Sequence, residues 1–450
     1  MLVIFLPLLG FSLKKGDASS IENYRPISIL PFISKILEKC IHSRLVSFLS
    51  SSNVLCAEQF GFRKNSSTAD ALISLTENFF ENINKKLSTI NVFVDYRKAF
   101  DTINHAILIR KLEAYGIRGV PLELFSSYLS NRSQRVIVND KSSSLRMQTL
   151  GVPQGTCLGP LLFTIYINEL PNISRKFKSL LFADDTTLTF DNSSYNFSSG
   201  FFNEELHNFY LWSVANRLSV NFDKTFYNVV SLSESDRASI PPVLISDKLI
   251  SQCTSFNFLG VTIDDNLKFD QHVLHISKKI SKSIGILSKL RIILPPFTLR
   301  SLYFSLVFPY LNYCNVVYGG AYACHLKPLE ALQKRAIRII NSAPFYSHTN
   351  DLFLRSQILK LADIFKLNVA IFMFKNRNNL DFQVPHDHYT RSSLELVSNF
   401  QRLSLTQKSL FFVGPKLWNT IPAFVKQSPS TNIFKSRYKR YLLGLYGNLS

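Results

Sequence analysis

The segment that most constrains the fold of this chain is residues 180–190, where two adjacent acids stand between two short apolar runs. Apolar, β-prone runs on either side of a short polar pair predict a β-hairpin with Asp184 and Asp185 at its tip. Acids are unfavourable there, because tight hairpin turns favour Asn-Gly or Asp-Gly and because adjacent carboxylates repel. Taken alone, the segment is better explained by a solvated acidic turn, since a short motif is only a hypothesis until its context fits. A local rule broken inside otherwise consistent strands often marks a functional site.

A third acid, Asp95, follows an apolar run at residues 89–94 that predicts a buried strand. A helix is predicted after it, over residues 104–115, with Asp101 or Thr102 as its N-cap. Asp95 lies too early to cap that helix, and the end of a core strand holds a side chain rigidly beside a cleft. If both strands belong to one sheet, the three carboxylates converge. Hard oxygen ligands suit Mg²⁺, and two such ions about 3.5–4 Å apart support nucleotidyl transfer.

Two loops suit contact with phosphates or nucleotides. In residues 59–63, Gly61 lies between aromatic residues and Arg63 follows, offering a planar guanidinium for bidentate phosphate contact. Residues 151–160 hold three glycines and two prolines, which predicts a defined loop before a helix over residues 161–170. Glycine there permits close approach of a ligand to the backbone. A solvated loop and a plain strand-to-helix connection are the alternatives.

The chain as a whole is strongly basic. Its 450 residues include 51 Lys and Arg against 31 Asp and Glu, a net charge of +20. A folded protein this basic most often binds a polyanion, with nucleic acid ahead of a membrane surface, although ordinary solubilising charge is the alternative. Its six cysteines show no zinc-site spacing, which favours a reduced compartment. Residues 1–13 are too short to span a bilayer and lack the basic start of a signal peptide, so we expect a strand or an arbitrary start within a longer reading frame.

The remaining segments predict helices with basic faces. Residues 33–41 carry apolar side chains at helical spacing, and residues 256–263 predict a further strand. Beyond Asp264 the chain becomes helical and basic. In residues 329–340 apolar side chains share one helix face and cations the other, and residues 434–441 alternate aromatic residues with cations. Such a face either follows a phosphate backbone or is simply solvated.

Taken in order, these motifs resemble those of the reverse transcriptases of non-LTR (LINE-type, jockey-like) retrotransposons. The resemblance runs from about Lys14 to the C-terminus, and each motif is weak alone, but their common order makes the assignment strong. The motifs are residues 14–17 and 23–28 in the opening block, 59–63 in the fingers block, Val94-Asp95 with Ala99-Phe100-Asp101, residues 151–155 with Gly159-Pro160, and Phe182-Ala183-Asp184-Asp185 in the palm, then Lys224-Thr225, Phe258-Leu259-Gly260 and residues 414–419.

This resemblance implies an α+β fold of the right-hand polymerase type, with fingers, palm and thumb, and with an additional helical and basic C-terminal region. Residues 1–88 would form a fingers-like part that is shortened at its start. Residues 89–264 would form the palm with the catalytic motifs. Residues 265–345 would form a helical thumb, and residues 346–450 the basic C-terminal region.

The resemblance also implies roles for individual residues. The implied site consists of Asp95, Asp184 and Asp185 as catalytic and metal-binding acids, of Arg63, Phe100, Gln154, Gly155 and Lys224 around the nucleotide, and of Phe258, Leu259 and Gly260 as a primer grip. Phe100 would be the steric gate that excludes a 2′-hydroxyl. The cofactor would be two Mg²⁺ ions, with Mn²⁺ as a substitute, and the partners an RNA template, a DNA primer and dNTPs.

The function implied is an RNA-directed DNA polymerase that extends a DNA 3′-hydroxyl on an RNA template, as in retrotransposition. One alternative is a catalytically silent nucleic-acid-binding remnant, and another is an RNA-dependent RNA polymerase, against which the aromatic Phe100 argues. The endonuclease that usually precedes the polymerase in this family is not expected in this chain, so we expect it to be supplied in trans. We also expect an intracellular location, in nucleus or cytoplasm, and no membrane partner.

Overall fold

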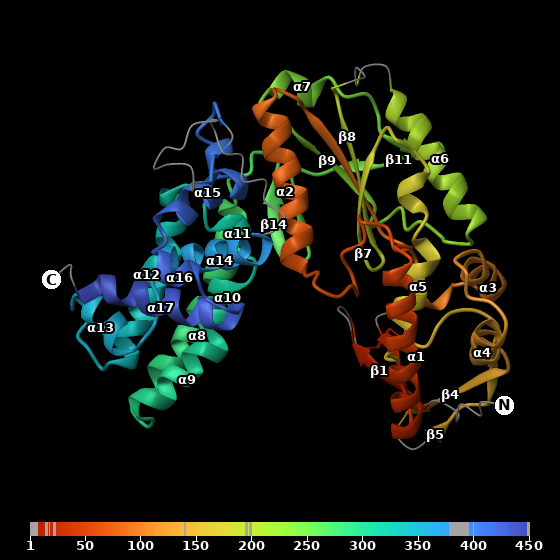
Figure 1. The fold of residues 1–450 in the computed structure, drawn as a ribbon, viewed down its shortest axis with the longest axis horizontal. Helices are drawn as coiled ribbons and strands as arrows, with labels where there is room; N and C mark the ends of the chain where they lie inside the picture. Colours follow the sequence, from red (N-terminus) through yellow and green to blue (C-terminus); the bar gives the residue numbers. More distant parts are fainter. Residues whose placement is uncertain are drawn as a thin grey trace. The chain divides into compact units, whose positions relative to one another are not determined.

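The chain folds into two compact units, described here from a computed structural model (Figure 1). The described residues are 8–13, 17, 19–20, 24–138, 141–193, 197, 200–377, 396–398 and 400–447. The first unit is drawn from residues 1–71, 89–229 and 234–253, and the second from residues 72–88, 230–233 and 254–450. Helices and antiparallel sheet occur together, which confirms the predicted α+β class. The four-part division into fingers, palm, thumb and C-terminal region stays a prediction.

The first unit combines two five-stranded sheets with helices. Its elements are β1 (Leu8–Leu13), β2 (Tyr24–Ile29), α1 (Phe32–Ser51), β3 (Thr89–Val94), η2 (Ala99–Asp101), α3 (His105–Ala114), α4 (Val120–Leu129), β4 (Arg132–Val138), β5 (Lys141–Ser142), β6 (Arg146–Gln148), α5 (Leu158–Ile167), η3 (Leu170–Asn172), β7 (Lys178–Phe182), β8 (Asp185–Asp191), α6 (Phe201–Ala215), β9 (Phe226–Val230), α7 (Glu234–Ala238), β10 (Leu244–Ile245), β11 (Lys248–Leu249) and β12 (Ser251–Gln252).

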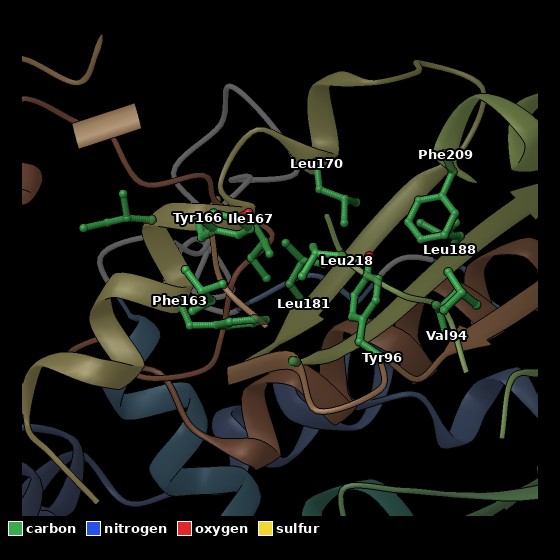
Figure 2. Packing of buried hydrophobic residues seen from close by; sticks show 14 of the residues in the cluster. Val94, Tyr96, Phe163, Tyr166, Ile167, Leu170, Leu181, Leu188, Phe209 and Leu218 are labelled. Carbon is green, nitrogen blue, oxygen red and sulfur yellow. The ribbon is translucent and has the colours of Figure 1, made fainter. Parts of the chain in front are cut away.

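The central sheet of this unit has the strand order β12-β9-β3-β8-β7. All six residues of β3 are buried, as expected for a central strand covered on both faces. Ile90, Val92 and Val94 lie on one face and belong to the main hydrophobic core with residues of α5 and α6. On the opposite face, the Phe93 ring stacks on Phe226 of β9, with ring centroids 5.2 Å apart. Figure 2 shows part of the core, including Val94, Leu188, Leu181, Phe163 and Phe209.

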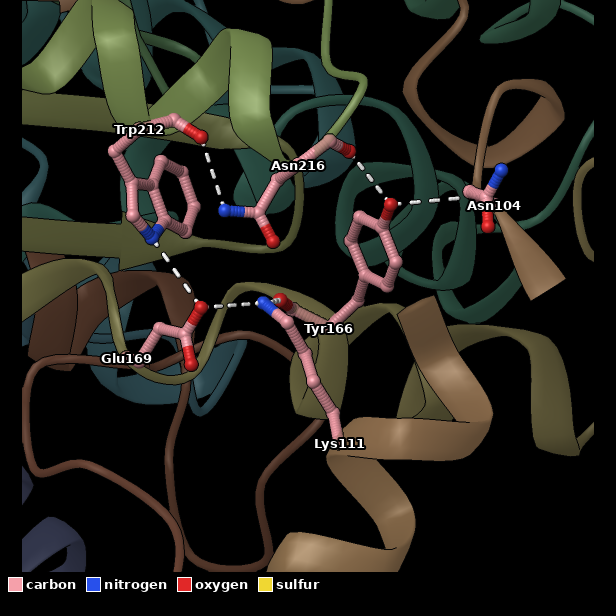
Figure 3. A network of polar contacts seen from close by, with 6 residues as sticks. All are labelled: Asn104, Lys111, Tyr166, Glu169, Trp212 and Asn216. Atoms are coloured by element: carbon pink, nitrogen blue, oxygen red, sulfur yellow. Dashed lines mark hydrogen bonds and ion pairs between the residues drawn. The ribbon is translucent and has the colours of Figure 1, made fainter. Parts of the chain in front are cut away.

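A polar network fastens α3, α5 and α6 together beside this core (Figure 3). The Lys111 ammonium donates to the Tyr166 carbonyl at 2.6 Å and lies 2.7 Å from Glu169 Oε1. Trp212 Nε1 donates to the same Glu169 oxygen at 3.3 Å, and the Tyr166 hydroxyl donates to the Asn216 carbonyl at 2.6 Å. Burial lowers the pKa of Lys111, while Glu169 opposes that change. Lys111 therefore carries a largely desolvated charge. Removal of either partner would leave the charge of the other without a counter-ion, which is unfavourable.

The second unit is mostly helical. Its elements are α2 (Thr68–Asn84, of which the first turn belongs to the first unit), β13 (Ser255–Phe258), β14 (Val261–Asp264), α8 (Asp270–Leu290), α9 (Pro296–Leu306), α10 (Phe308–Asn312), α11 (Asn315–Tyr318), α12 (Ala323–Ile340), α13 (Asn350–Arg355), α14 (Leu361–Asn376), η5 (Thr406–Lys408), α15 (Leu410–Thr420), α16 (Ala423–Lys426) and α17 (Thr431–Gly447).

The C-terminal helices have their own aromatic core. The Phe434 ring of α17 stacks on Phe374 of α14 and on Trp418 of α15, with centroids 4.4 and 6.0 Å apart. The buried Glu77 carboxylate of α2 accepts hydrogen bonds from the Ser409 hydroxyl and from the backbone N–H of Leu410, the latter at 2.6 Å. This carboxylate satisfies donors at the start of α15 that have no partner within the helix. Burial raises the pKa of Glu77, and these hydrogen bonds oppose that change.

Several local predictions differ from the structure. Residues 256–263 form the hairpin β13–β14 rather than one strand. Asn104, not Asp101 or Thr102, caps α3, because its side chain accepts from the Ile107 N–H at 3.1 Å. The helix predicted over residues 161–170 begins and ends three residues earlier, as α5.

The predicted helix α1 forms, but its apolar residues near the start are largely exposed. Ile33 keeps 77% of its surface exposed and Ile36 48%, whereas Glu38, Leu45 and Leu49 are buried. A local periodicity therefore predicted the helix but not the face that packs.

We predict that the Lys111–Glu169 pair stabilises the first unit. Lys111→Met leaves a partly buried carboxylate without its cation, so the free energy of unfolding should fall by about 1–3 kcal/mol. The double variant Lys111→Met/Glu169→Gln should recover part of this loss. Urea unfolding checks both variants.

The matched control is Lys85→Met, because Lys85 and Glu81 form an i,i+4 pair with both side chains 57% exposed. That change should alter stability by less than about 0.5 kcal/mol. A Lys111 variant that behaves like the Lys85 variant would contradict the prediction.

Candidate active site

The acidic segment forms the predicted hairpin, but the two acids occupy different positions in it. Phe182 pairs with Asp185, so the turn consists of Ala183 and Asp184, and Asp185 is the first residue of β8. Ala183 has a φ of +56° whereas Asp184 does not have a positive φ, which is the φ pattern of a type II′ turn. A positive φ is strained for alanine by about 1–2 kcal/mol. The turn that presents Asp184 is therefore held by its surroundings rather than by its own preference.

The register of β3 and β8 brings Asp95 to Asp185. Val94 pairs with Thr186 in an antiparallel ladder, so the next position along each strand places Asp95 opposite Asp185. Because side chains alternate across a strand, both acids lie on the Phe93 face and not on the face that packs against α5 and α6. Directly opposed residues have Cβ atoms about 4.5–5.5 Å apart in such a pair. The ladder thus ends in two facing carboxylates, with Asp184 one residue away at the turn.

Desolvation and two neighbouring negative charges act on Asp185. The pKa of Asp185 is raised to about 6, first by loss of hydration and then by the negative charges of Asp184 and Asp95. Asp185 is nevertheless exposed at the end of the sheet. Solvent screening therefore keeps any stability effect well below that of a fully buried acid with the same pKa. Mutual repulsion at this edge is the condition that a bound cation would relieve.

Asp95 is anchored by a loop that follows α6. The Asn221 side-chain amide donates to Asp95 Oδ2 at 3.0 Å, and the Asn221 backbone N–H donates to the Asp95 carbonyl at 2.8 Å. The backbone N–H of Asp95 donates to the Thr225 hydroxyl at 3.3 Å. The exposed Lys224 ammonium lies 4.0 Å from Asp95 Oδ2. These contacts fix the carboxylate and leave an exposed cation on a flexible side chain beside it.

The loop with Arg63 packs directly onto the acidic hairpin. Gln59 is 1% exposed, and its side-chain oxygen accepts from the backbone N–H of Gly61 at 2.7 Å and of Ala183 at 3.2 Å. A Cβ at Gly61 would lie 2.3 Å from the Ala183 nitrogen, so only glycine permits this approach. Arg63 donates to the Cys56 carbonyl at 2.5 Å. This contact steadies the loop and engages one of the five guanidinium donors.

The second predicted loop joins the turn that carries Phe100. The Val152 N–H donates to the Phe100 carbonyl at 2.9 Å, and the Gln154 side-chain amide donates to Asp101 Oδ1 at 2.8 Å. Gly155 has a φ of +92°, and a Cβ there would come within 3.1 Å of the Ile27 side chain. The half-buried Phe100 ring packs on Phe163, with centroids 4.6 Å apart. The structure thus places Phe100 in one segment and Gln154 and Gly155 in another, and hydrogen bonds join the two segments.

The predicted primer grip lies in the second unit, at the turn of the β13–β14 hairpin. Leu259 and Gly260 both have a positive φ, as two-residue type I′ turns require. The Tyr313 hydroxyl donates to the Leu259 carbonyl at 2.6 Å. A Cβ at Gly260 would lie 3.3 Å from the Tyr313 ring, and Phe258 is buried. The structure therefore presents an exposed, braced turn at these residues.

Sequence reasoning did not identify which residues position the acids, although Gln59 and Thr225 lie within motifs named above. The hydrogen bonds that Gln59, Asn221 and Thr225 make to Ala183 or Asp95 join residues 124, 126 and 130 positions apart in the chain. Glu38 was missed as well. Buried in α1, it accepts from the Tyr128 hydroxyl at 2.8 Å and from the Cys157 N–H at 2.7 Å, beside the Gln154 loop. Gln59 and Thr225 lie in the motifs at residues 59–63 and 224–225, whereas Asn221 and Glu38 carry no local pattern that would have singled them out.

Two absences hold for the described residues. No group of three or more His, Cys, Asp or Glu side chains within those ranges lies close enough to hold a metal ion. The acids nonetheless fit a cation, because they offer hard oxygen donors whose charges already interact. None of the helices in the described part of the chain is both long and apolar enough to cross a membrane.

Comparisons with known proteins identify the family to which the chain is similar. Residues 13–263, more than half of the chain, match the family described as Reverse transcriptase (RNA-dependent DNA polymerase). The chain is 29% identical over 360 residues to the RNA-directed DNA polymerase from mobile element jockey of Drosophila melanogaster, covering 77% of this chain and 38% of that protein. It is 30% identical over 351 residues to the probable RNA-directed DNA polymerase from transposon X-element of the same species, with coverages of 76% and 38%. The predicted resemblance is thereby confirmed.

The relatives are longer than this chain, which spans 38% of the length of both. Among solved structures, that of apo telomerase from Candida tropicalis aligns with a TM-score of 0.45 at 12% identity, covering 85% of this chain and 68% of that chain.

We predict a pH-dependent effect of Asp185 on stability in EDTA. An unfolded aspartate titrates near about 3.9, and the folded Asp185 near about 6, so the folded state binds this proton more tightly. The resulting stability is complete below about pH 4 and is lost as the pH rises through about 6. Asp185→Asn removes that loss and should melt at a higher temperature than wild type at about pH 7.5, with the difference vanishing near about pH 4.

Thermal unfolding across this pH range checks the prediction. Asp223→Asn is the matched control, because the Asp223 side chain is 87% exposed. Its Oδ2 lies 3.5 Å from Nη2 of Arg97, so it is paired with a cation and not with other acids. It should give no comparable pH-dependent difference. A constant offset between Asp185→Asn and wild type at every pH would show that the three charges do not interact.

Proposed function

This chain belongs to the reverse transcriptase (RNA-dependent DNA polymerase) family, and we propose that it extends a DNA 3′-hydroxyl with dNTPs on an RNA template, as in retrotransposition. The observation that carries the proposal is the strand register that sets Asp95 opposite Asp185, with Asp184 at the adjoining turn. Nucleotidyl transfer needs carboxylates held rigidly at one edge and facing open space. The end of this central sheet provides that arrangement.

Enzymes of this family generally use divalent metal ions. Asp95, Asp184 and Asp185 would hold two Mg²⁺ ions, with Mn²⁺ as a substitute. Such ions, when bound, supply charge that lowers the pKa of the attacking hydroxyl and stabilises the leaving oxygen. Asn221 keeps Asp95 Oδ2 oriented, and the Gln59 contact to Ala183 keeps the turn in its strained conformation. Both contacts preorganise the acids before substrate arrives.

The nucleotide-binding roles rest on the loops around the acids. Gln154 and Gly155 line the pocket for the incoming nucleotide. Phe100 lies beneath the sugar of that nucleotide, where an aromatic ring leaves no room for a 2′-hydroxyl. Arg63 contacts the incoming triphosphate with the guanidinium donors that the Cys56 carbonyl does not use. Lys224, exposed and 4.0 Å from Asp95, reaches the leaving phosphate.

Primer binding and partners complete the proposal. Phe258, Leu259 and Gly260 brace the primer end with the backbone of an exposed turn. The RNA template and DNA primer are polyanions, and the net charge of +20 favours their association. An endonuclease would provide the DNA 3′-hydroxyl. The site of action is intracellular, in nucleus or cytoplasm.

We predict that Asp184→Asn abolishes polymerisation without unfolding the chain. Primer extension on poly(A)/oligo(dT) with dTTP and Mg²⁺ should fall by about 100-fold or more, because the ions that would stabilise the developing negative charge would lose one carboxylate ligand. In the absence of nucleotide, Mg²⁺ should raise the melting temperature of wild type more than that of the variant.

Asp223→Asn is again the control and should retain wild-type extension. Equal incorporation by wild type and Asp184→Asn would reject the proposed function. Extension without a Mg²⁺-dependent melting shift would instead place the metal ligands elsewhere.

We predict that Phe100 selects against ribonucleotides. Phe100→Ala should increase the incorporation of rNTPs relative to dNTPs, because the ring that excludes the 2′-hydroxyl is gone. Phe100→Tyr retains the ring and should keep the wild-type ratio. Single-nucleotide extension with each substrate measures the ratio, and a melting curve follows the loss of packing on Phe163. An unchanged ratio in a folded Phe100→Ala variant would remove Phe100 from this role.

A further inference from the structure

The C-terminal helices enclose a cleft that polymerisation does not explain. A cleft of about 530 Å³ lies between α16 and α17. Its lining combines cations with aromatic rings: Phe424, Gln427, Arg437, Arg440 and Tyr441. All five belong to the second unit. A cavity of this size accommodates a group as large as one nucleotide.

The two arginines are arranged to share an anion. Arg437, Arg440 and Tyr441 follow one another at i, i+3 and i+4 on α17, so their side chains share one helix face. Arg437 Nη1 donates to the Phe424 carbonyl at 3.1 Å, which fixes the guanidinium at the cleft. Both arginines are exposed. A guanidinium held through one nitrogen keeps its other donors for a planar phosphate contact.

The rings offer stacking surfaces beside these cations. Phe424 keeps 58% of its surface exposed, so its ring is accessible to a ligand. The half-buried Tyr441 ring stacks on Tyr438, with centroids 6.2 Å apart, and so is held in place. One exposed ring and one braced ring near two guanidiniums are the components with which proteins bind unpaired bases.

Charge in this region has one sign only. Residues 396–450 contain eight Lys and Arg residues and no Asp or Glu: Arg402, Lys408, Lys416, Lys426, Lys435, Arg437, Lys439 and Arg440. The acid that acts on Tyr438 comes from α14, and this residue, Asp363, is buried and paired with Lys366 at 2.9 Å. No carboxylate among the described residues of 396–447 therefore competes for the cations of the cleft.

We propose that this cleft binds single-stranded nucleic acid, with Arg437 and Arg440 on the phosphates and a base stacked on Phe424 or Tyr441. A duplex hides the faces of its bases and would leave the exposed ring without a partner, so an unpaired strand fits better. An acidic peptide would use the arginines but not the rings. The cleft shares no residue with the proposed polymerase centre, and binding there needs no catalytic activity.

The test is binding by the full chain in EDTA, where polymerisation does not occur. The probes are fluorescein-labelled U15 RNA and T15 DNA, with the matching duplex and a poly-Glu peptide as competitors. Strands carrying 4-thiouridine or 4-thiothymidine report the site itself, because they crosslink on irradiation and the modified peptide is identified by mass spectrometry. Comparison of the RNA and DNA strands tells which of the two the cleft prefers.

We predict crosslinks within the peptides that carry Phe424 and Tyr441. Arg437→Gln/Arg440→Gln should reduce this crosslinking by about 10-fold and lower the salt dependence of log K by about 1.4, from two lost phosphate contacts. Phe424→Ala should reduce it by about 5-fold or more, because one stacking surface is removed. Arg440→Gln alone, which breaks no hydrogen bond of the cleft, should show a smaller loss and unchanged melting.

The control is Arg110→Gln/Arg118→Gln, which removes two exposed charges from the first unit and should leave the crosslinks unchanged. Equal losses in both double variants would mean that binding depends only on the overall charge of the chain, and this result would overturn the proposal. Displacement by poly-Glu or by duplex as readily as by unlabelled U15 would also overturn it. Because no readout involves nucleotide incorporation, an inactive polymerase with intact crosslinking rejects the proposed function but not this site.

Discussion

The register of β3 against β8 is the constraint on which the rest of the site depends. Six backbone pairs, from Thr89 with Asp191 to Val94 with Thr186, fix which residues lie opposite one another. A slip of one residue would turn Val92 and Leu188 out of the core and would separate Asp95 from Asp185. The same ladder therefore specifies the hydrophobic core on one face and the acidic edge on the other. Stability and chemistry are coupled through a single alignment of two strands.

The acidic edge is electrostatically unfavourable, and its neighbours compensate for it. The pKa of Asp185 is raised to about 6 partly by the charges of Asp184 and Asp95. Asn221 and Thr225 hold Asp95, and Gln59 holds the backbone of Ala183 in a strained turn. These contacts come from two separate parts of the chain, the loop at residues 221–225 and Gln59, so relaxation of the carboxylates away from one another would require both segments to move. Repulsion is thus retained where a cation would be useful.

Local sequence patterns predicted the parts of the structure that are locally determined. β3 has the predicted bounds, the acidic hairpin forms, and α3 differs from its prediction by one residue at each end. The candidate acids were found for the same reason, since each follows or interrupts an apolar run. The split of residues 256–263 was missed because Leu259 adopts a positive φ that its residue type does not suggest. Turn geometry of this kind depends on Tyr313, which lies 54 residues away in the chain.

Long-range polar contacts account for most of what sequence reasoning could not supply, and the C-terminal region shows why they matter. Glu77 and the start of α15 are separated by more than 330 residues, yet the carboxylate is buried only because Ser409 and Leu410 donate to it. An ionisable group left there without these donors would be strongly unfavourable. The C-terminal helices are therefore an integral part of the second unit and not an appended tail. With Phe434 and Trp418 committed to its core, the remaining cations and the exposed Phe424 of α16 and α17 are left as surface, on a framework rigid enough to present them.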